Sequence, residues 1–209
     1  METSLHGYLA LGDSYTIGEG VAANAHWPDR LVQLLADAGL ELGRPKIIAQ
    51  TGWTCAELAA AITAEQPPGH WRLVSLLIGV NDQYRGYPLA EYGPRFAQLL
   101  EQAITLTDGR PQHVLVLSIP DWGVTPFARS GGHDPARIAA QIDCYNAIAR
   151  AQAAARGTAF LDITAVSRAH GSDDAMLADD GLHPGAAMHA LWASAALPVV
   201  RAMLSKQTR

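Results

Sequence analysis

Short apolar segments that alternate with amphipathic helical segments constrain the fold of this chain more than any other feature. The predicted strands are residues 5–11, 46–50, 72–79, 113–119 and 159–163. Between them, apolar residues recur at helical spacing, as at Leu31, Leu34, Leu35 and Ala38. Strands that alternate with helices form a parallel sheet covered on both faces. The sequence therefore predicts an α/β fold, with a three-layer α/β/α arrangement and a flavodoxin-like five-stranded parallel sheet in the order 2-1-3-4-5.

Particular residues mark the ends or faces of other predicted elements. Thr54 is followed three residues later by Glu57, a capping box that predicts the start of a helix. The segment 120–127 contains two prolines and a glycine and is predicted to be a loop. A stripe of apolar residues predicts the last helix. The residues of that stripe are Trp192, Ala195, Val199 and Met203.

Composition and charge limit the partners of this chain. It has 209 residues, 49% of them hydrophobic, and neither a linker nor a repeat divides it. One domain over residues 1–209 is therefore expected. The formal net charge of -5 and the pI of about 5.9 argue against nucleic acid or an anionic membrane as the main partner. We expect no membrane span, and the sequence does not determine the oligomeric state.

Targeting, redox and cofactor signals are few. Residues 1–6 lack the basic and apolar regions of a signal peptide, so a cytoplasmic location is expected. Cys55 and Cys144 make no disulfide framework, and both are predicted to be buried free thiols on apolar helix faces. No metal-ligand spacing is found among the eight histidines, and no Gly-rich phosphate loop follows the first strand. We therefore expect no metal and no cofactor.

Candidate catalytic residues follow the predicted strands. Ser14 follows the first strand, Gly52 the second and Asn81 the third. Asp180 and His183 lie just before the last helix. Because the carboxyl ends of parallel strands meet at one edge of a sheet, these residues are expected to converge on one crevice.

This set of residues suits acyl transfer. A serine hydroxyl such as that of Ser14 needs a base within hydrogen-bond reach, and His183 can serve. The imidazole needs a carboxylate to fix its tautomer, which Asp180 can supply. The tetrahedral intermediate needs N–H donors for its oxyanion. The backbone N–H groups of Ser14 and Gly52 and the side-chain amide of Asn81 are the candidate donors.

Four motif blocks of the chain resemble those of a known family. The blocks are Gly12–Ser14, Gly52, Gly79–Asp82 and Asp180–His183. In this order and spacing they resemble the SGNH hydrolases, also called the GDSL esterase/lipase family. The resemblance implies a flavodoxin-like fold and ester or thioester hydrolysis. It implies Ser14 as nucleophile, Asp180 and His183 as its triad partners, and oxyanion donors at Ser14, Gly52 and Asn81.

The chain departs from the family pattern at two places. Tyr15 and Thr16 follow the serine, so the leucine of the older family name is absent. Gln50 and Thr51 precede Gly52, where many members have Asn-Ala. Neither change removes a catalytic group. Asp13, between the glycine and the serine of the first block, is expected to fix the loop rather than to react.

The predicted function is a serine esterase that hydrolyses small-molecule carboxylic esters with short acyl or aryl groups. Acyl-CoA thioesterase, lysophospholipase and carbohydrate acetylesterase activities of the same site remain open. Two alternatives belong to other classes, a metal-dependent phosphoesterase and a non-catalytic ligand-binding module. The phosphoesterase needs an Asp-x-His pair after the first strand, whereas here Ser14 and Tyr15 follow Asp13.

Aromatic residues gather near the motif blocks. They either cover edges of the core or line an apolar pocket for the substrate, and both interpretations remain open. These residues are Tyr15, Trp53, Tyr84, Tyr87, Trp122 and Phe127.

Overall fold

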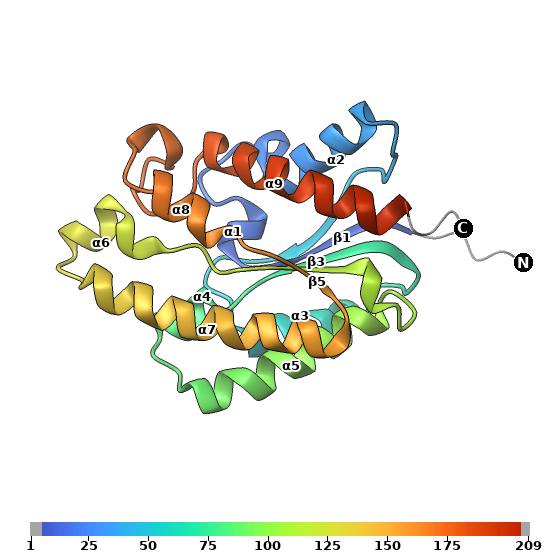
Figure 1. Ribbon diagram of the computed structural model, residues 1–209, viewed down its shortest axis with the longest axis horizontal. Helices are drawn as coiled ribbons and strands as arrows, with labels where there is room; N and C mark the ends of the chain where they lie inside the picture. Colours follow the sequence, from blue (N-terminus) through green and yellow to red (C-terminus); the bar gives the residue numbers. More distant parts are fainter. Residues whose placement is uncertain (1–5, 206–209) are drawn as a thin grey trace, which may run out of the picture.

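The computed structural model describes residues 6–205 and has a central sheet of five parallel strands (Figure 1). The strands are β1 (His6–Gly12), β2 (Lys46–Ala49), β3 (Trp71–Leu77), β4 (Val114–Leu117) and β5 (Ala159–Leu161). They lie in the order β2-β1-β3-β4-β5, and neighbouring strands pair in parallel. The predicted sheet and its strand order are therefore confirmed. Residues 1–5, on which the prediction about a signal peptide depends, lie outside the described residues.

Helices cover both faces of the sheet (Figure 1). One layer contains α2 (Trp27–Asp37), α8 (Thr164–His170) and α9 (Ala186–Ser205). The other layer contains α3 (Cys55–Glu65), α5 (Leu89–Thr105) and α7 (Pro135–Arg156). In the first layer α9 packs against α2 and α8, and in the second α5 packs against α3 and α7. The predicted three layers are confirmed, and a single domain over residues 1–209 stays a prediction.

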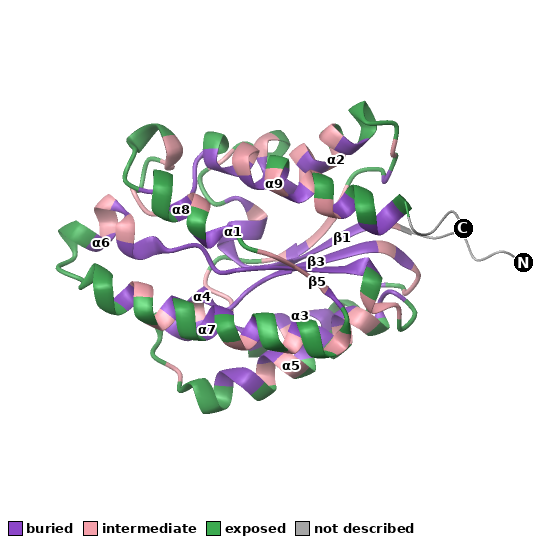
Figure 2. Cartoon of the chain, viewed as in Figure 1, coloured by how far each residue is buried: buried purple, intermediate pink, exposed green. Residues whose placement is uncertain are grey.

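The strands form the centre of the core. Residues Tyr8–Leu11 of β1 have no exposed surface, and all of β4 is buried. Figure 2 shows this buried band between helices whose outer faces are exposed. The hydroxyls of Tyr8 and Ser75 share a hydrogen bond of 2.8 Å between β1 and β3. Because each hydroxyl has a partner, its burial is not costly.

Local hydrogen bonds determine where α3 begins. The backbone N–H of Glu57 donates to Thr54 Oγ1, and the backbone N–H of Thr54 donates to Glu57 Oε2 at 2.8 Å. The predicted capping box is therefore confirmed. The backbone N–H of Cys55 donates to Asp82 Oδ2 at 2.9 Å. This bond ties the start of α3 to the segment that follows β3.

The prediction for one of the two cysteines is wrong. Cys55 is buried as expected, whereas Cys144 is exposed. The buried face of α7 contains Ile142, Tyr145 and Ala149. Residues two apart on a helix do not share a face, so Cys144 points away from the side that buries Ile142.

The segment 120–127, predicted to be a loop, contains helical turns. They are η3, a 3-10 helix over Trp122–Val124, and α6, an α-helix that begins at Pro126 and ends at Ser130. Thr125 Oγ1 accepts the backbone N–H of Ala128 at 3.3 Å and so caps α6. Proline favours turns and also the first turn of a helix, so the residue types could not distinguish a loop from a short helix.

Helix α9 differs from its prediction in two respects. Its buried face contains Trp192, Ala196 and Val200, whereas Ala195 and Val199 are only half-buried. It is also, within residues 6–205, the one helix long and apolar enough to cross a membrane, although no such stretch was expected. Of that stretch, 44% is buried in the structure, where α9 packs against α2 and β5. The buried face of α9 is therefore part of the protein core.

Candidate active site

The turn after β1 presents Ser14 at the carboxyl edge of the sheet. β1 ends at Gly12, and the short helix α1 (Ser14–Ile17) begins two residues later. A Cβ atom at Gly12 would lie 2.2 Å from Thr16 Oγ1 and 2.5 Å from the carbonyl oxygen of Leu77. Only glycine fits so close to both groups, so this position makes the sharp turn possible.

Asp13 holds that turn from inside. Its Oδ1 accepts the backbone N–H of Tyr15 at 3.0 Å and caps α1. The side chain is fully buried, and its second oxygen has no hydrogen-bond partner among the described residues. Burial, together with the nearby charge of Asp82, raises the pKa of Asp13 to about 8. Asp13 thus has the contacts of a structural residue in the loop that carries Ser14.

Asp180 orients His183 and the residue before it through three hydrogen bonds. Its Oδ1 accepts the backbone N–H groups of Leu182 and His183, both at 2.9 Å. Its Oδ2 lies 2.5 Å from His183 Nδ1. Burial alone would raise the pKa of Asp180, but the bonds from His183 and Leu182 together hold that pKa below its usual value. An ionised carboxylate only accepts, so Nδ1 carries the proton and Nε2 is left as a base.

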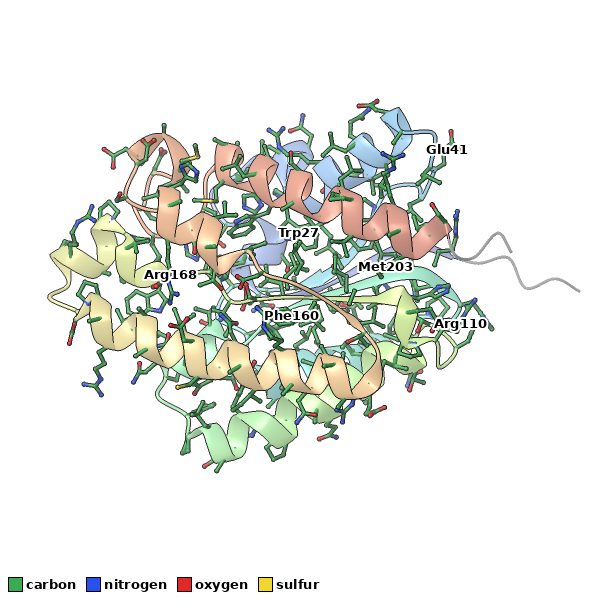
Figure 3. The ribbon with its side chains drawn as sticks, in the orientation of Figure 1. Trp27, Glu41, Arg110, Phe160, Arg168 and Met203 are labelled. Carbon is green, nitrogen blue, oxygen red and sulfur yellow. The ribbon has the colours of Figure 1, made fainter. Side chains whose placement is uncertain are left out.

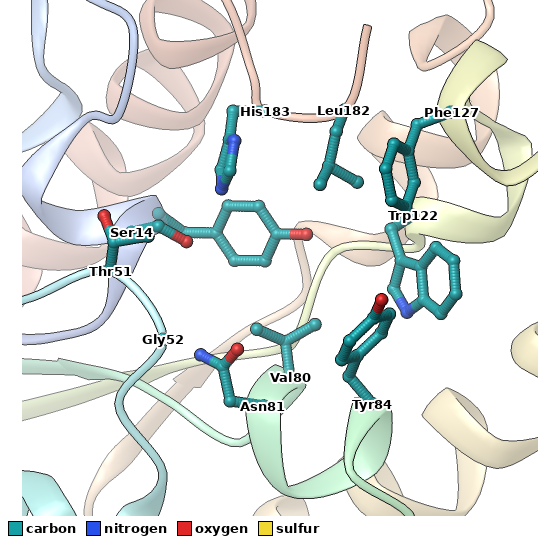
Figure 4. Close-up of a pocket in the computed structure, with 11 residues that line it drawn as sticks. Ser14, Thr51, Gly52, Val80, Asn81, Tyr84, Trp122, Phe127, Leu182 and His183 are labelled. Carbon is teal, nitrogen blue, oxygen red and sulfur yellow. The ribbon is translucent and has the colours of Figure 1, made fainter. Parts of the chain in front are cut away.

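Ser14 and His183 line one pocket (Figure 4). In Figure 4 the ring of His183 lies beside Ser14, with a ring nitrogen directed toward the serine side chain. The ring of Tyr15 meets the ring of His183 edge-on, with centroids 6.1 Å apart, and meets Trp192 in the same way. The imidazole is therefore supported by an aromatic contact to the core as well as by Asp180.

Gly52 lies in the same pocket, in the turn after β2. Its φ of +88° is in the left-handed region that glycine adopts without strain. Its carbonyl oxygen accepts from Arg85 Nη2 at 2.6 Å, and Arg85 also pairs with Glu57 at 3.3 Å. Since the carbonyl is held toward Arg85, the orientation of the turn is fixed at this residue.

Asn81 is the second residue of α4 (Val80–Tyr84) and also lines the pocket. Its Nδ2 donates to the carbonyl oxygen of Trp53 at 2.9 Å. An amide nitrogen carries two hydrogens, so one remains for a ligand. The structure thus brings all the predicted site residues together: Ser14, Gly52, Asn81 and His183 line the pocket, and Asp180 binds His183.

The pocket has a volume of about 200 Å³ and a largely apolar wall. Of the aromatic residues noted in the sequence, Tyr15, Tyr84, Trp122 and Phe127 line it. Trp53 contributes only its carbonyl oxygen, through Asn81. The pocket-lining interpretation therefore holds for four of the aromatic residues. Within residues 6–205, no three side chains of His, Cys, Asp or Glu are grouped to hold a metal ion.

Gln83 has a place near the site that the sequence did not indicate. It is 5% exposed, its Oε1 accepts the indole N–H of Trp122, and its Nε2 donates to Gln141 Oε1, each at 2.8 Å. A glutamine in a short polar helix resembles a surface residue in sequence. Its partners lie 39 and 58 residues away, so no local pattern could have identified it.

Solved structures share this fold. A lipase/acylhydrolase from Enterococcus faecalis is 19% identical, with 97% of each chain covered and a TM-score of 0.68. A variant of Axe2, an acetyl xylan esterase from Geobacillus stearothermophilus, is 23% identical, with 96% of this chain and 97% of that chain covered and a TM-score of 0.67. A phospholipase A1 from Streptomyces albidoflavus is 20% identical, with 96% and 100% covered and a TM-score of 0.64.

A comparison with curated protein sequences finds no match. A family model, in contrast, matches residues 10–191, which include the turn after β1 and the loop of Asp180 and His183. That match covers most of the chain and contains every residue of the site described above. The chain belongs to the GDSL-like lipase/acylhydrolase family, the SGNH hydrolases.

Proposed function

We propose that this hydrolase is a serine esterase that cleaves carboxylic esters with short acyl groups. The observation that carries the proposal is the pairing of Asp180 with His183 at 2.5 Å, on a ring that faces Ser14 in one pocket. A hydroxyl, a base and a carboxylate that orients the base are the parts of an acyl-transfer triad.

In the proposed reaction, Ser14 Oγ attacks the ester carbonyl carbon as His183 Nε2 takes the hydroxyl proton. The oxyanion accepts hydrogen bonds from the backbone N–H groups of Ser14 and Gly52 and from the free hydrogen of Asn81 Nδ2. The intermediate then expels the alcohol, which receives the proton from His183. Water attacks the acyl-serine by the reverse proton path and releases the acid.

The size and lining of the pocket support a small substrate. Its volume of about 200 Å³ is below the range of roughly 300–1,000 Å³ that is usual for sites of drug-sized ligands. The apolar side chains of Val80, Phe127 and Leu182 suit an alkyl or aryl group. Among proteins of the same fold, one is named an acetyl xylan esterase and one a phospholipase A1. Acetylated sugars, lysophospholipids and acyl-CoA thioesters, which the sequence left open, are the competing substrates.

The test combines labelling with a substrate panel. A fluorophosphonate probe should modify Ser14 in the wild type and leave Ser14→Ala unlabelled. Turnover of p-nitrophenyl acetate should fall by about 10³-fold or more in Ser14→Ala. Acetyl-xylan, a lysophospholipid and an acyl-CoA complete the panel. Full activity in Ser14→Ala would overturn the proposal.

Each alternative function from another class has its own test. Activity that EDTA abolishes and added metal restores would favour a metal-dependent phosphoesterase. A ligand-binding module would show neither fluorophosphonate labelling nor turnover of any substrate in the panel. We also propose a cytoplasmic location, which fractionation of cells that express the full chain would test.

A further inference from the structure

The catalytic pocket ends at a wall of two aromatic side chains with a second cavity behind it. Tyr84 and Trp122 line both the pocket of about 200 Å³ and an adjoining cavity of about 580 Å³. Their rings meet at an interplanar angle of 67°, with centroids 5.4 Å apart. Figure 4 shows both side chains at the end of the pocket away from Ser14. These two rings therefore form part of the boundary between the two spaces.

The indole of Trp122 is held by Gln83. Trp122 and Gln83 are 4% and 5% exposed, and the indole N–H donates to Gln83 Oε1 at 2.8 Å. An indole can only donate, so Gln83 must present its oxygen to it. The Gln83 amide is itself held by Gln141 on α7, to which Nε2 donates at 2.8 Å. Loss of the acceptor would leave a buried donor unpaired, which disfavours the present position of the ring.

The backbone at Trp122 is fixed by other contacts. Asp121 Oδ2 accepts from Arg168 Nε at 2.8 Å, and Asp121 Oδ1 accepts the backbone N–H of Gly123 at 2.9 Å. Thr125 Oγ1 donates to the carbonyl oxygen of Trp122 at 2.7 Å. Figure 3 shows Arg168 on α8, on the side that faces this segment and α7. With the backbone held, the freedom that remains is rotation of the Trp122 side chain, which Gln83 restricts.

We propose that Trp122 sets an upper limit on acyl-chain length and that Gln83 is the positioning residue that keeps the indole in the wall. This inference rests on the esterase function proposed above. The side of the wall that faces Ser14 is lined by Tyr15, Val80 and Phe127, whose apolar surfaces suit an acyl chain. An acyl chain that is too long for this pocket meets the indole of Trp122. The adjoining cavity begins on the other side of that ring.

The experiment compares kcat/KM for p-nitrophenyl octanoate and p-nitrophenyl acetate. The wild type should prefer the acetate. Trp122→Ala joins the two spaces and should raise the octanoate-to-acetate ratio by about 10-fold or more, within the range that chain-length discrimination by an apolar pocket reaches. Gln83→Met keeps the bulk of the side chain without an acceptor, and should shift the ratio in the same direction by a smaller factor.

A conservative variant provides the matched control. Gln83→Glu retains an oxygen that accepts the indole N–H but loses the bond to Gln141 Oε1, so its ratio should lie closer to that of the wild type than the ratio of Gln83→Met does. A residue that only supported the fold would lower both rates together in each variant and leave the ratio unchanged. Fluorophosphonate labelling of Ser14 reports whether each variant has an assembled site. If Trp122→Ala is not labelled, Gln83→Met decides the question.

A second series assigns the pocket to the acyl side of the ester. Ethyl acetate and octyl acetate differ only in the alcohol, so their ratio should be the same in the wild type and Trp122→Ala. A shift in this ratio instead of the acyl ratio would overturn the acyl assignment. An unchanged octanoate-to-acetate ratio in labelled Trp122→Ala and Gln83→Met would overturn the role of the wall. Absence of ester hydrolysis by the wild type is a different result, because it removes the proposed function itself.

Discussion

Asp180 holds both the ring and the backbone of His183: Nδ1 lies 2.5 Å from Oδ2, and the backbone N–H donates to Oδ1 at 2.9 Å. His183→Ala should therefore be almost as inactive as Ser14→Ala, since nucleophile and base act as a unit. Asp180→Asn should cost less in kcat, because it weakens the orientation of the base but leaves the imidazole in place. Single-turnover kinetics with p-nitrophenyl acetate measure the three variants. Retention of most activity in His183→Ala would assign the base to another residue.

Asn81→Ala should lower kcat by about 10²–10³ and leave KM nearly unchanged, because an oxyanion donor acts in the transition state. The same change removes the bond from Nδ2 to the carbonyl oxygen of Trp53, so a small loss of stability is expected as well. Asn81→Asp, which keeps the size but has no donor, should be at least as harmful. Melting temperature and kcat are measured on one preparation. A lowered melting temperature with wild-type kcat would leave Asn81 a purely structural role.

Asp13→Asn should make the stability of the protein less sensitive to a rise in pH through neutrality. The pKa of Asp13 is raised to about 8 by burial, whereas in the unfolded chain it is near 3.9. Between these values the folded state holds a proton that the unfolded state has lost, so stability falls as pH rises toward 8. The slope is about 1.4 kcal/mol per pH unit at most. Asparagine stays neutral and can still accept the N–H of Tyr15.

The measurement for Asp13 is urea unfolding at pH 6 and pH 8. The free energy of unfolding of the wild type should fall by about 2 kcal/mol more than that of Asp13→Asn over this interval. Asp37→Asn, at the exposed end of α2, is the control and should follow the wild type. Parallel curves for the wild type and Asp13→Asn would mean that Asp13 keeps an ordinary pKa in the fold.

His189 should destabilise the protein in acid. Its Nδ1 accepts the backbone N–H of Trp27, which lies beneath α9 in Figure 3, at 3.0 Å. The side chain is fully buried, and burial lowers its pKa to about 3. Below about pH 6.5 the unfolded chain takes up a proton that the folded state refuses, so stability falls as pH decreases toward 3. At pH 5 this loss is about 2 kcal/mol relative to neutral pH.

The variant His189→Asn tests this effect. It replaces the acceptor with an amide oxygen that does not titrate, at the cost of some packing. It should be less stable than the wild type at pH 7 but lose less on transfer to pH 5. Asp13 acts in the opposite direction throughout this interval, so the stability of the variant is compared with that of the wild type at each pH. If the free energy of unfolding of His189→Asn changes between pH 7 and pH 5 as it does in the wild type, the prediction is wrong.

The sequence by itself determined the order of the elements, the sheet and the edge at which the site residues meet. Periodicity distinguishes strands from helices because it reflects which side of each element faces the core. The capping box at Thr54 is equally local, since its contacts lie within three residues. The turn at Gly12 is local only in part, because the glycine also makes room for the carbonyl oxygen of Leu77 on β3. Parallel strand order then brings Ser14, Gly52 and Asn81 together, because all three follow carboxyl ends.

Only the tertiary structure decided which faces of these elements are buried and which side chains of different elements are in contact. Cys144 proved exposed because the face that α7 buries depends on how the helix rotates against the sheet and its neighbours. The bond from Trp122 to Gln83 spans 39 residues, and that from Trp27 to His189 spans 162. Such pairs require side chains of separate elements to pack at fixed distances. One sequence records which residues are apolar or polar, but not which of them will touch.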